Sequence, residues 1–227
     1  MADTSFTGDR KEPMVSPTAA IEQRFVRWAV PRVPAAIGSH HLTLMTLAWS
    51  ALLVLAGWLA AAHSIHWLWL SSLMLFMQWL TDSLDGSVGR MRNAGLRRWG
   101  YYMDHFLDYV FMACVMGHYA FLYDGATRVL FLLLVPLYAA FEVNSWLEYG
   151  ATGRFRITFN GVGPTEVRLL FVLINTALVC FGTVWLAAAL PWAMVIIAVL
   201  LVTTVVPTQR RIWKQDMEEK KNSATDE

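Results

Sequence analysis

The chain has 227 residues, of which 56% are hydrophobic and 15% are charged, and its formal net charge is +1. This composition is too apolar for a soluble domain of that length, so it excludes that class and indicates a membrane protein. The small net charge also argues against a nucleic acid partner, which would favour a strongly basic surface.

The N-terminal part of the chain is polar, and residues 1–17 are expected to be disordered. Between residues 18 and 30, Ile21, Phe25 and Trp28 recur at i, i+4 and i+7, which places them on one face of a helix. Charged residues occupy the other face and prolines follow. We therefore expect an N-terminal amphipathic helix that lies at the membrane interface. An ordinary cytosolic helix is the alternative.

Six apolar runs follow, each long enough to cross the hydrocarbon core of a bilayer as a helix. They lie near residues 42–62, 66–88, 99–122, 127–149, 164–186 and 189–207. The sequence therefore predicts an all-α integral membrane protein with six transmembrane helices, forming one membrane domain over residues 18–208. Residues 209–227 are expected to be a polar cytoplasmic tail, which starts as a short surface helix and ends in disorder.

The basic residues predict the orientation of these helices. Of the 18 lysine and arginine residues, 17 fall on one side of the predicted membrane, and only Arg128 lies in a connection on the other side. By the positive-inside rule, both termini of this multi-pass protein are expected in the cytoplasm. We expect the membrane to be a bacterial cytoplasmic membrane.

Four aspartates occupy two neighbouring spans, although a carboxylate is costly to hold near hydrocarbon. Asp82 and Asp85 come at the cytoplasmic end of the second span, and Asp104 and Asp108 in the first turns of the third. All four are therefore at one depth. Each pair is separated by about one helical turn, so the four carboxylates are expected to converge in one polar cleft.

Four anions this close together need a positive charge among them. Hard divalent cations supply it, and two Mg²⁺ ions about 3.5 to 4 Å apart are the usual arrangement for phosphoryl transfer. Gly86, Gly89 and Gly100 recur on the same faces, where a missing side chain lets a polyphosphate approach the backbone. Packing of small residues between helices is the alternative explanation for each glycine.

The spacing of these residues resembles that of a known family. The pattern Asp-x2-Asp-Gly-x2-Ala-Arg-x8or9-Gly-x3-Asp-x3-Asp identifies the CDP-alcohol phosphotransferases, also called CDP-alcohol phosphatidyltransferases. The matching residues here are Asp82, Asp85, Gly86, Gly89, Arg90, Gly100, Asp104 and Asp108, with nine residues between Arg90 and Gly100. Only Gly89 departs from the pattern, as a small residue in place of the usual alanine. The family also has six transmembrane helices, and the resemblance covers residues 20 to 207.

The resemblance implies a membrane-bound transferase of phospholipid synthesis. Its donor is a CDP-linked alcohol, whose β-phosphorus is attacked by the hydroxyl of an acceptor alcohol, and CMP leaves. At least one of the two alcohols is normally a lipid. Mg²⁺ is the implied cofactor, with Mn²⁺ as an alternative, and a homodimer is the implied assembly.

The resemblance also implies roles for single residues. The metal ligands would be Asp82, Asp85, Asp104 and Asp108, and Asp108 would share in metal binding or act as the general base. The CDP moiety would be bordered by Asp82, Gly86, Gly89, Arg90 and Gly100. Arg90 has a second interpretation, as a positive-inside residue that contacts lipid phosphates.

The identity of the two alcohols stays open. The stretch TGRFRITFNGVGPTEVRLL is weakly similar to choline- and ethanolamine-phosphotransferases, in which case Glu166 and Glu142 would face a cationic amino alcohol. Glu166 also fits a normal helix start after a proline. Alternatively, Arg154, Arg156 and Arg168 would hold the phosphate of a phosphorylated polyol, as in family members that use CDP-diacylglycerol, or would only mark the cytoplasmic side.

Two other functions are alternatives. Intramembrane aspartates also bind the coupling ion in ion or proton transporters, but those sites lie near the midplane and on broken helices, whereas these aspartates lie beside a basic loop. A structural membrane protein whose aspartates only cap helices does not account for Asp85 and Asp108. The predicted function is therefore phosphoryl transfer.

Overall fold

A computed structural model describes residues 18–153 and 163–223 of the chain, and the structural statements below concern these residues. They form helices and no strand, which confirms the predicted all-α fold for this part of the chain. The α-helices are α1 (Ala19–Ala29), α2 (Ser39–Ala62), α3 (Leu68–Met91), α4 (Arg97–His118), α5 (Gly125–Thr152), α6 (Pro164–Phe181) and α7 (Val184–Ser223). Short 3₁₀ turns are η2 (Val30–Arg32), η3 (Ile65–Trp67) and η4 (Tyr119–Leu122). The predicted disorder of residues 1–17 and the candidates Arg154 and Arg156 lie outside the described residues.

Four of the helices are long and apolar enough to cross a membrane, namely α2, α5, α6 and α7. The helices α3 and α4 have 24 and 22 residues, but they carry the aspartates and several arginines. The length and composition of these four helices thus support a membrane protein.

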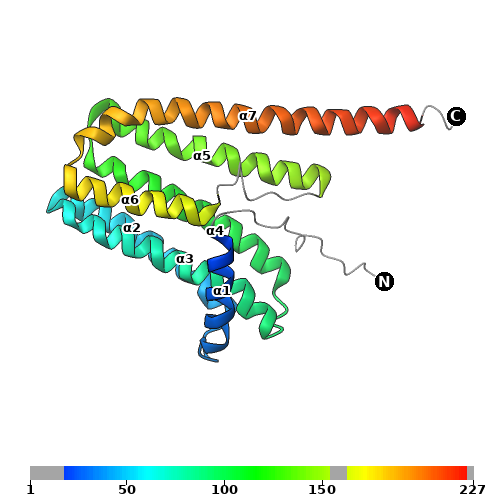
Figure 1. The fold of residues 1–227 in the computed structure, drawn as a ribbon, viewed down its shortest axis with the longest axis horizontal. Coiled ribbons are helices and arrows are strands. Elements are labelled where there is room, and N and C mark those ends of the chain that lie inside the picture. The colour runs from blue at the N-terminus through cyan, green and yellow to red at the C-terminus, as the bar shows by residue number, and fades with distance from the viewer. Residues whose placement is uncertain (1–17, 154–162, 224–227) are drawn as a thin grey trace.

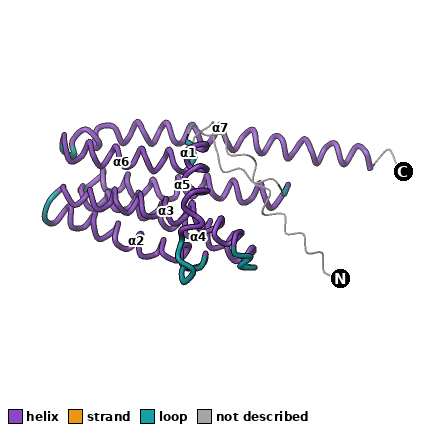
Figure 2. Tube along the Cα trace, turned by 60° about the horizontal axis from the view of Figure 1, so that its bottom comes forward, coloured by secondary structure: helices purple, strands orange, loops and turns teal. Residues whose placement is uncertain are grey.

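The long helices α2 to α7 lie side by side with roughly aligned axes (Figure 1). Helix α2 packs against α3 and α4, α3 against α6, α4 against α5, and α5 against α7. In a view from another side, α7 again runs beside the other long helices (Figure 2). We call the end at which α3 ends and α4 begins the α3–α4 end. Helices α2 and α6 also begin there, and α5 ends there (Figure 1).

Apolar side chains fill the space between α2, α3 and α4. Leu53, Leu75, Phe111 and Val115 belong to one buried cluster with almost no exposed surface. The backbones approach closely at Gly57, where a Cβ atom would lie 2.7 Å from Cβ of His118 on α4. Small residues allow such close helix packing within a membrane. Helix α2 packs against both α3 and α4, and side chains of α3 and α4 meet in this cluster, so the aspartates of the two helices come close together.

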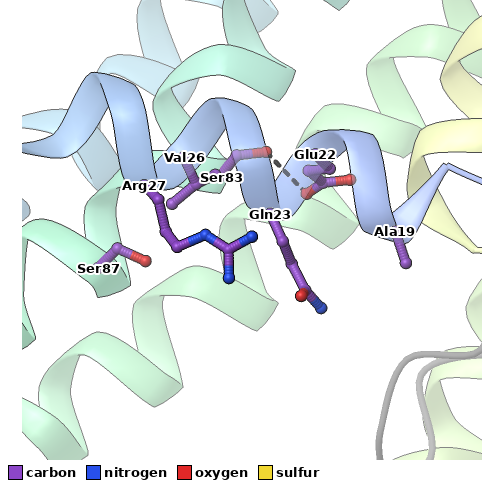
Figure 3. Close-up of a pocket in the computed structure, with 7 residues that line it drawn as sticks. All are labelled: Ala19, Glu22, Gln23, Val26, Arg27, Ser83 and Ser87. Carbon is purple, nitrogen blue, oxygen red and sulfur yellow. Dashed lines mark hydrogen bonds between the residues drawn. The ribbon is translucent and has the colours of Figure 1, made fainter.

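The amphipathic helix α1 runs across the long helices at the α3–α4 end (Figures 1 and 2). Its Phe25 stacks on Trp79 of α3 at a ring centroid distance of 5.4 Å, while Ile21 and Trp28 are exposed. Glu22 accepts hydrogen bonds from Ser83 of α3 (Figure 3) and from Thr165 of α6. Phe25 of the apolar face and Glu22 of the charged face therefore both attach α1 to the bundle.

Arg92 holds the segment between α1 and α2 against the end of α3. Its guanidinium donates to the backbone oxygens of Ile37 at 2.5 Å and of Val33 at 2.6 Å. The sequence pattern marked this arginine only as part of the basic loop. The structure gives it a second role, because it satisfies carbonyl groups in a connection that contains two prolines.

The C-terminal helix differs from the predicted span and tail. The sixth helix was expected over residues 189–207 after a fifth that ended at residue 186, but α6 ends at Phe181 and α7 continues to Ser223. Gly182, with φ of 77°, ends α6 because glycine adopts this conformation without steric strain. Beyond Pro207 the chain is rich in Gln, Arg, Lys and Glu, which are strong helix formers.

A buried ion pair also holds this extension. Arg211 of α7 pairs with Glu148 of α5, whose side chain is 3% exposed. An interior proline costs one intrahelical hydrogen bond and a clash with the preceding turn, yet α7 continues through Pro207, and the ion pair beyond it supports the continuation. Helix α7 consequently runs past the end of α5 (Figure 1).

Candidate metal centre

Three of the four predicted aspartates converge at the α3–α4 end. Asp82 comes from α3, and Asp104 and Asp108 come from one face of α4. One carboxylate oxygen of each lies within 4.8 Å of the others. We call these three residues the aspartate cluster. Oxygen ligands of one Mg²⁺ at about 2.1 Å are at most about 4.2 Å apart, so a small inward shift of this donor set would fit a hard divalent cation.

A buried arginine supplies a positive charge to the aspartate cluster. Arg168, in the second turn of α6, is only 6% exposed. Its Nη2 donates to Asp82 Oδ2 at 2.9 Å and to Asp108 Oδ1 at 3.2 Å. Arg168 thereby joins α6 to both α3 and α4. The sequence had made it a candidate for binding an acceptor's phosphate, and the structure pairs it with two predicted metal ligands.

Gln78 is a neighbour of the cluster that the sequence analysis did not identify. It is fully buried on α3, one turn before Asp82, and its Nε2 donates to Asp108 Oδ1 at 2.9 Å. Its Oε1 is buried and accepts no hydrogen bond from the described residues. The sequence does contain a sign of this role. Gln78 is the one polar residue in the apolar stretch LMLFMQWL, and it lies four residues before Asp82, on the same face of the helix.

The fourth aspartate faces a different helix. Asp85 is 8% exposed, and its Oδ2 accepts a hydrogen bond of 2.5 Å from Thr43 Oγ1 of α2. Its Oδ1 also accepts from the backbone amide of Gly86. The expected convergence of four carboxylates therefore holds for three of them. Asp85 follows Asp82 by three residues, so the two side chains leave α3 about 60° apart, and α2 packs on the side of Asp85.

The predicted nucleotide-binding residues lie near the cluster in different surroundings. A Cβ at Gly89 would lie 3.3 Å from the side chain of Ser39, so close packing of α2 and α3 accounts for this glycine. A Cβ at Gly100 would meet no described atom within 4 Å, and no packing contact explains the glycine there. Arg90 is exposed and donates to Ser87 Oγ at 3.0 Å.

Glu142 borders the aspartate cluster from α5. Its Oε1 accepts a hydrogen bond of 2.7 Å from Tyr138 Oη, one turn earlier on the same helix. The charges of Glu142 and Asp108 interact electrostatically. Glu142 is therefore an acidic residue beside the cluster, and its role toward a head group stays a prediction.

Glu166 serves the start of α6 and the attachment of α1. Its Oε2 accepts from the backbone amide of Gly163 at 2.9 Å, which caps the helix. Its Oε1 accepts from Thr18 Oγ1 at 2.6 Å. These contacts match the alternative interpretation of Glu166 as a normal helix start, and they direct its carboxylate toward the beginning of α1.

A groove of about 310 Å³ lies between α1 and α3 at the same end of the bundle (Figure 3). It is lined by Ala19, Glu22, Gln23, Val26, Arg27, Ser83 and Ser87. None of the four aspartates lines it. Ser87 also accepts the hydrogen bond from Arg90, so the groove adjoins the predicted nucleotide face of α3.

Comparison with known proteins found no relative of the chain. No family model, curated protein or solved structure matches the chain. The function is therefore argued from the residues and their geometry.

Proposed function

We propose that the protein is a Mg²⁺-dependent CDP-alcohol phosphotransferase of a membrane. The observation that carries this proposal is the convergence of Asp82, Asp104 and Asp108 from two neighbouring helices. These residues belong to the spacing pattern that resembles the CDP-alcohol phosphotransferase motif. A cluster of three carboxylates with one buried arginine is a suitable site for a divalent cation that also binds a diphosphate.

In the proposed reaction, an acceptor hydroxyl oxygen forms a bond to the β-phosphorus of the CDP-alcohol, and the bond from that phosphorus to CMP breaks. A bound Mg²⁺ supplies charge that stabilises the phosphoryl oxygens and the leaving CMP. Asp108 takes the proton of the hydroxyl. The hydrogen bonds that Asp108 accepts from Gln78 and Arg168 both fall on Oδ1 and hold the carboxylate in place.

Lipid substrates require that the site be reached from a membrane. The proposal therefore includes α3 and α4 as spans, which gives six, with both termini in the cytoplasm. Its support is that α3 and α4, with 24 and 22 residues, are longer than the apolar helix α6 with 18, and that α3 packs against both α2 and α6. The aspartate cluster would then lie at the cytoplasmic interface, where a nucleotide from water and an alcohol from lipid can meet.

Binding of two Mg²⁺ ions would require Asp85 to change its partner. The aspartate cluster offers ligands for one cation, and Asp85 accepts a hydrogen bond from Thr43 instead of joining the cluster. A second Mg²⁺ would require the Asp85 carboxylate to exchange this hydrogen bond for a metal contact.

The choice of donor remains open between two classes. Glu142 beside the cluster supports a cationic alcohol, such as choline or ethanolamine, while capping by Glu166 removes one of the two residues assigned to that role. The pairing of Arg168 with aspartates likewise weakens its assignment to a phosphorylated acceptor. The experiment therefore uses donors of both classes.

The test is CMP release by the purified protein in detergent with Mg²⁺, a lipid or polyol acceptor, and CDP-diacylglycerol, CDP-choline or CDP-ethanolamine as the donor. We expect turnover with one donor class, identified by product mass, and no turnover in Asp104→Asn. Folded protein that turns over none of these donors, yet dissipates an ion gradient in liposomes, would support the transporter alternative instead.

A further inference from the structure

Arg168 occupies the position of a counter-ion inside the aspartate cluster. Its side chain is 6% exposed and bridges Asp82 on α3 and Asp108 on α4. An unpaired carboxylate is costly to bury, so a positive charge among these groups stabilises the protein when no metal is bound. Nε of Arg168 is buried and has no hydrogen-bond partner among the described residues. The guanidinium is thus held mainly by the two carboxylates.

Arg168 and a divalent cation would neutralise the same negative charges. When all three carboxylates of the cluster are ionised, as cation binding requires, they carry three negative charges, and Arg168 reduces this to two, which one divalent cation balances. Without Arg168, the same cation would still face one surplus negative charge. Repulsion between like charges over a few ångströms is strong in a poorly solvated site, so the guanidinium must lower the cation affinity.

We infer that Arg168 is the built-in counter-ion of the metal-free cluster, and that its charge sets the cation affinity of the site below the value that the three aspartates alone would give. This inference rests on the metal site of the proposed function. Its consequence for the reaction is that a second cation would bind well only together with the negative charge of a diphosphate.

The test is a titration of the metal-stripped protein in detergent with Mn²⁺, read by electron paramagnetic resonance of free Mn²⁺, without nucleotide. We expect Arg168→Gln to bind Mn²⁺ at least about tenfold more tightly than wild type. Arg168→Lys, which keeps the charge, should stay within about threefold of wild type. In EDTA, the Gln variant should melt at a lower temperature than wild type, and saturating Mg²⁺ should raise its Tm by more.

The control is Arg27→Gln, which removes an exposed arginine from α1 at the same end of the bundle. It tests whether any lost positive charge has the same effect, and we expect a change below about threefold. Arg168→Gln leaves buried carboxylates without their counter-ion, which can prevent folding. A second comparison therefore removes one negative charge together with Arg168, so that the net charge of the cluster stays as in wild type. Asp82→Asn with Arg168→Gln should bind Mn²⁺ more tightly than Asp82→Asn alone.

Equal or weaker Mn²⁺ binding by folded Arg168→Gln, or by the double variant relative to its Asp82→Asn parent, would overturn the inference. Arg168 would then orient the carboxylates for the metal instead of opposing it. That result would leave the proposed function intact, because the wild type would still bind the ion. Failure of folded wild type to bind Mn²⁺ would contradict both this inference and the metal site.

Discussion

Thr43 Oγ1 of α2 donates a hydrogen bond of 2.5 Å to Asp85 Oδ2 of α3. Asp85 is 8% exposed, so this contact lies inside the helix pair that packs most extensively in the described structure. The bond separates Asp85 from the three aspartates that converge. It also gives Asp85 a structural role besides the metal-binding role that the motif implies.

Thr43→Val should therefore destabilise the protein, since it keeps the side-chain shape and leaves a buried carboxylate without this donor. We expect a loss of about 1 to 2 kcal/mol in the free energy of unfolding, in the range of hydrogen bonds to charged groups and between membrane helices. Thermal and denaturant unfolding in detergent measure it. Thr46→Val, a change at another buried threonine of α2, is the control and should cost less. Equal stability of the two variants would argue that Asp85 does not need Thr43.

Asp108→Asn should separate the role of general base from that of metal ligand. If Asp108 accepts the proton, the variant keeps near-native affinity for Mg²⁺ and for the CDP-alcohol, and turnover falls by about 10² to 10⁴-fold. Calorimetric binding and single-turnover rates measure the two effects separately. Asp124→Asn, at an exposed aspartate at the start of α5, should change neither quantity. A parallel collapse of metal affinity would make Asp108 a ligand and place the base elsewhere.

Gln78→Leu should lower activity without lowering stability. Gln78 holds Asp108 through one hydrogen bond, and its Oε1 is a buried acceptor without a described donor. Loss of the hydrogen bond frees the Asp108 carboxylate to turn, and we expect kcat to fall about tenfold with little change in the KM for the donor. The free energy of unfolding should change little, because Arg168 still donates to the same oxygen of Asp108 and the unpaired Oε1 of Gln78 is removed. A variant that loses stability and activity together would indicate a purely structural role.

Cysteine accessibility should test whether α4 crosses the membrane, as the six-span topology requires. Cys114 and Cys180 are both free, so a background lacking them allows single cysteines to be introduced. A cysteine at Ala94, between α3 and α4, should react with a membrane-impermeant maleimide only after the cells are opened, whereas one at Asp124, before α5, should react in intact cells. Labelling of both positions from the same side would contradict the crossing of the membrane by α4.

The sequence by itself determined the helical segments and the aspartate positions. Long apolar runs are sufficient to specify helices, because hydrogen bonds within each helix satisfy the backbone groups wherever water is excluded. The spacing of Asp104 and Asp108 likewise placed both carboxylates on one face of α4, and both lie in the cluster. The continuous α7 was missed, because the polar tail was expected to form a separate short surface helix, and the Arg211–Glu148 ion pair that supports the continuous helix depends on tertiary packing.

Only the tertiary structure decided which groups the carboxylates meet. Helical periodicity puts Asp85 within about 60° of Asp82 around the α3 axis, and this difference is too small for the sequence to tell which neighbouring helix each one faces. The positions of α2 and α6 decide which partner each aspartate meets, since Thr43 of α2 contacts Asp85 and Arg168 of α6 contacts Asp82. Pairings between residues 42 or 86 positions apart depend on how helices pack, which the local pattern of a single sequence does not encode.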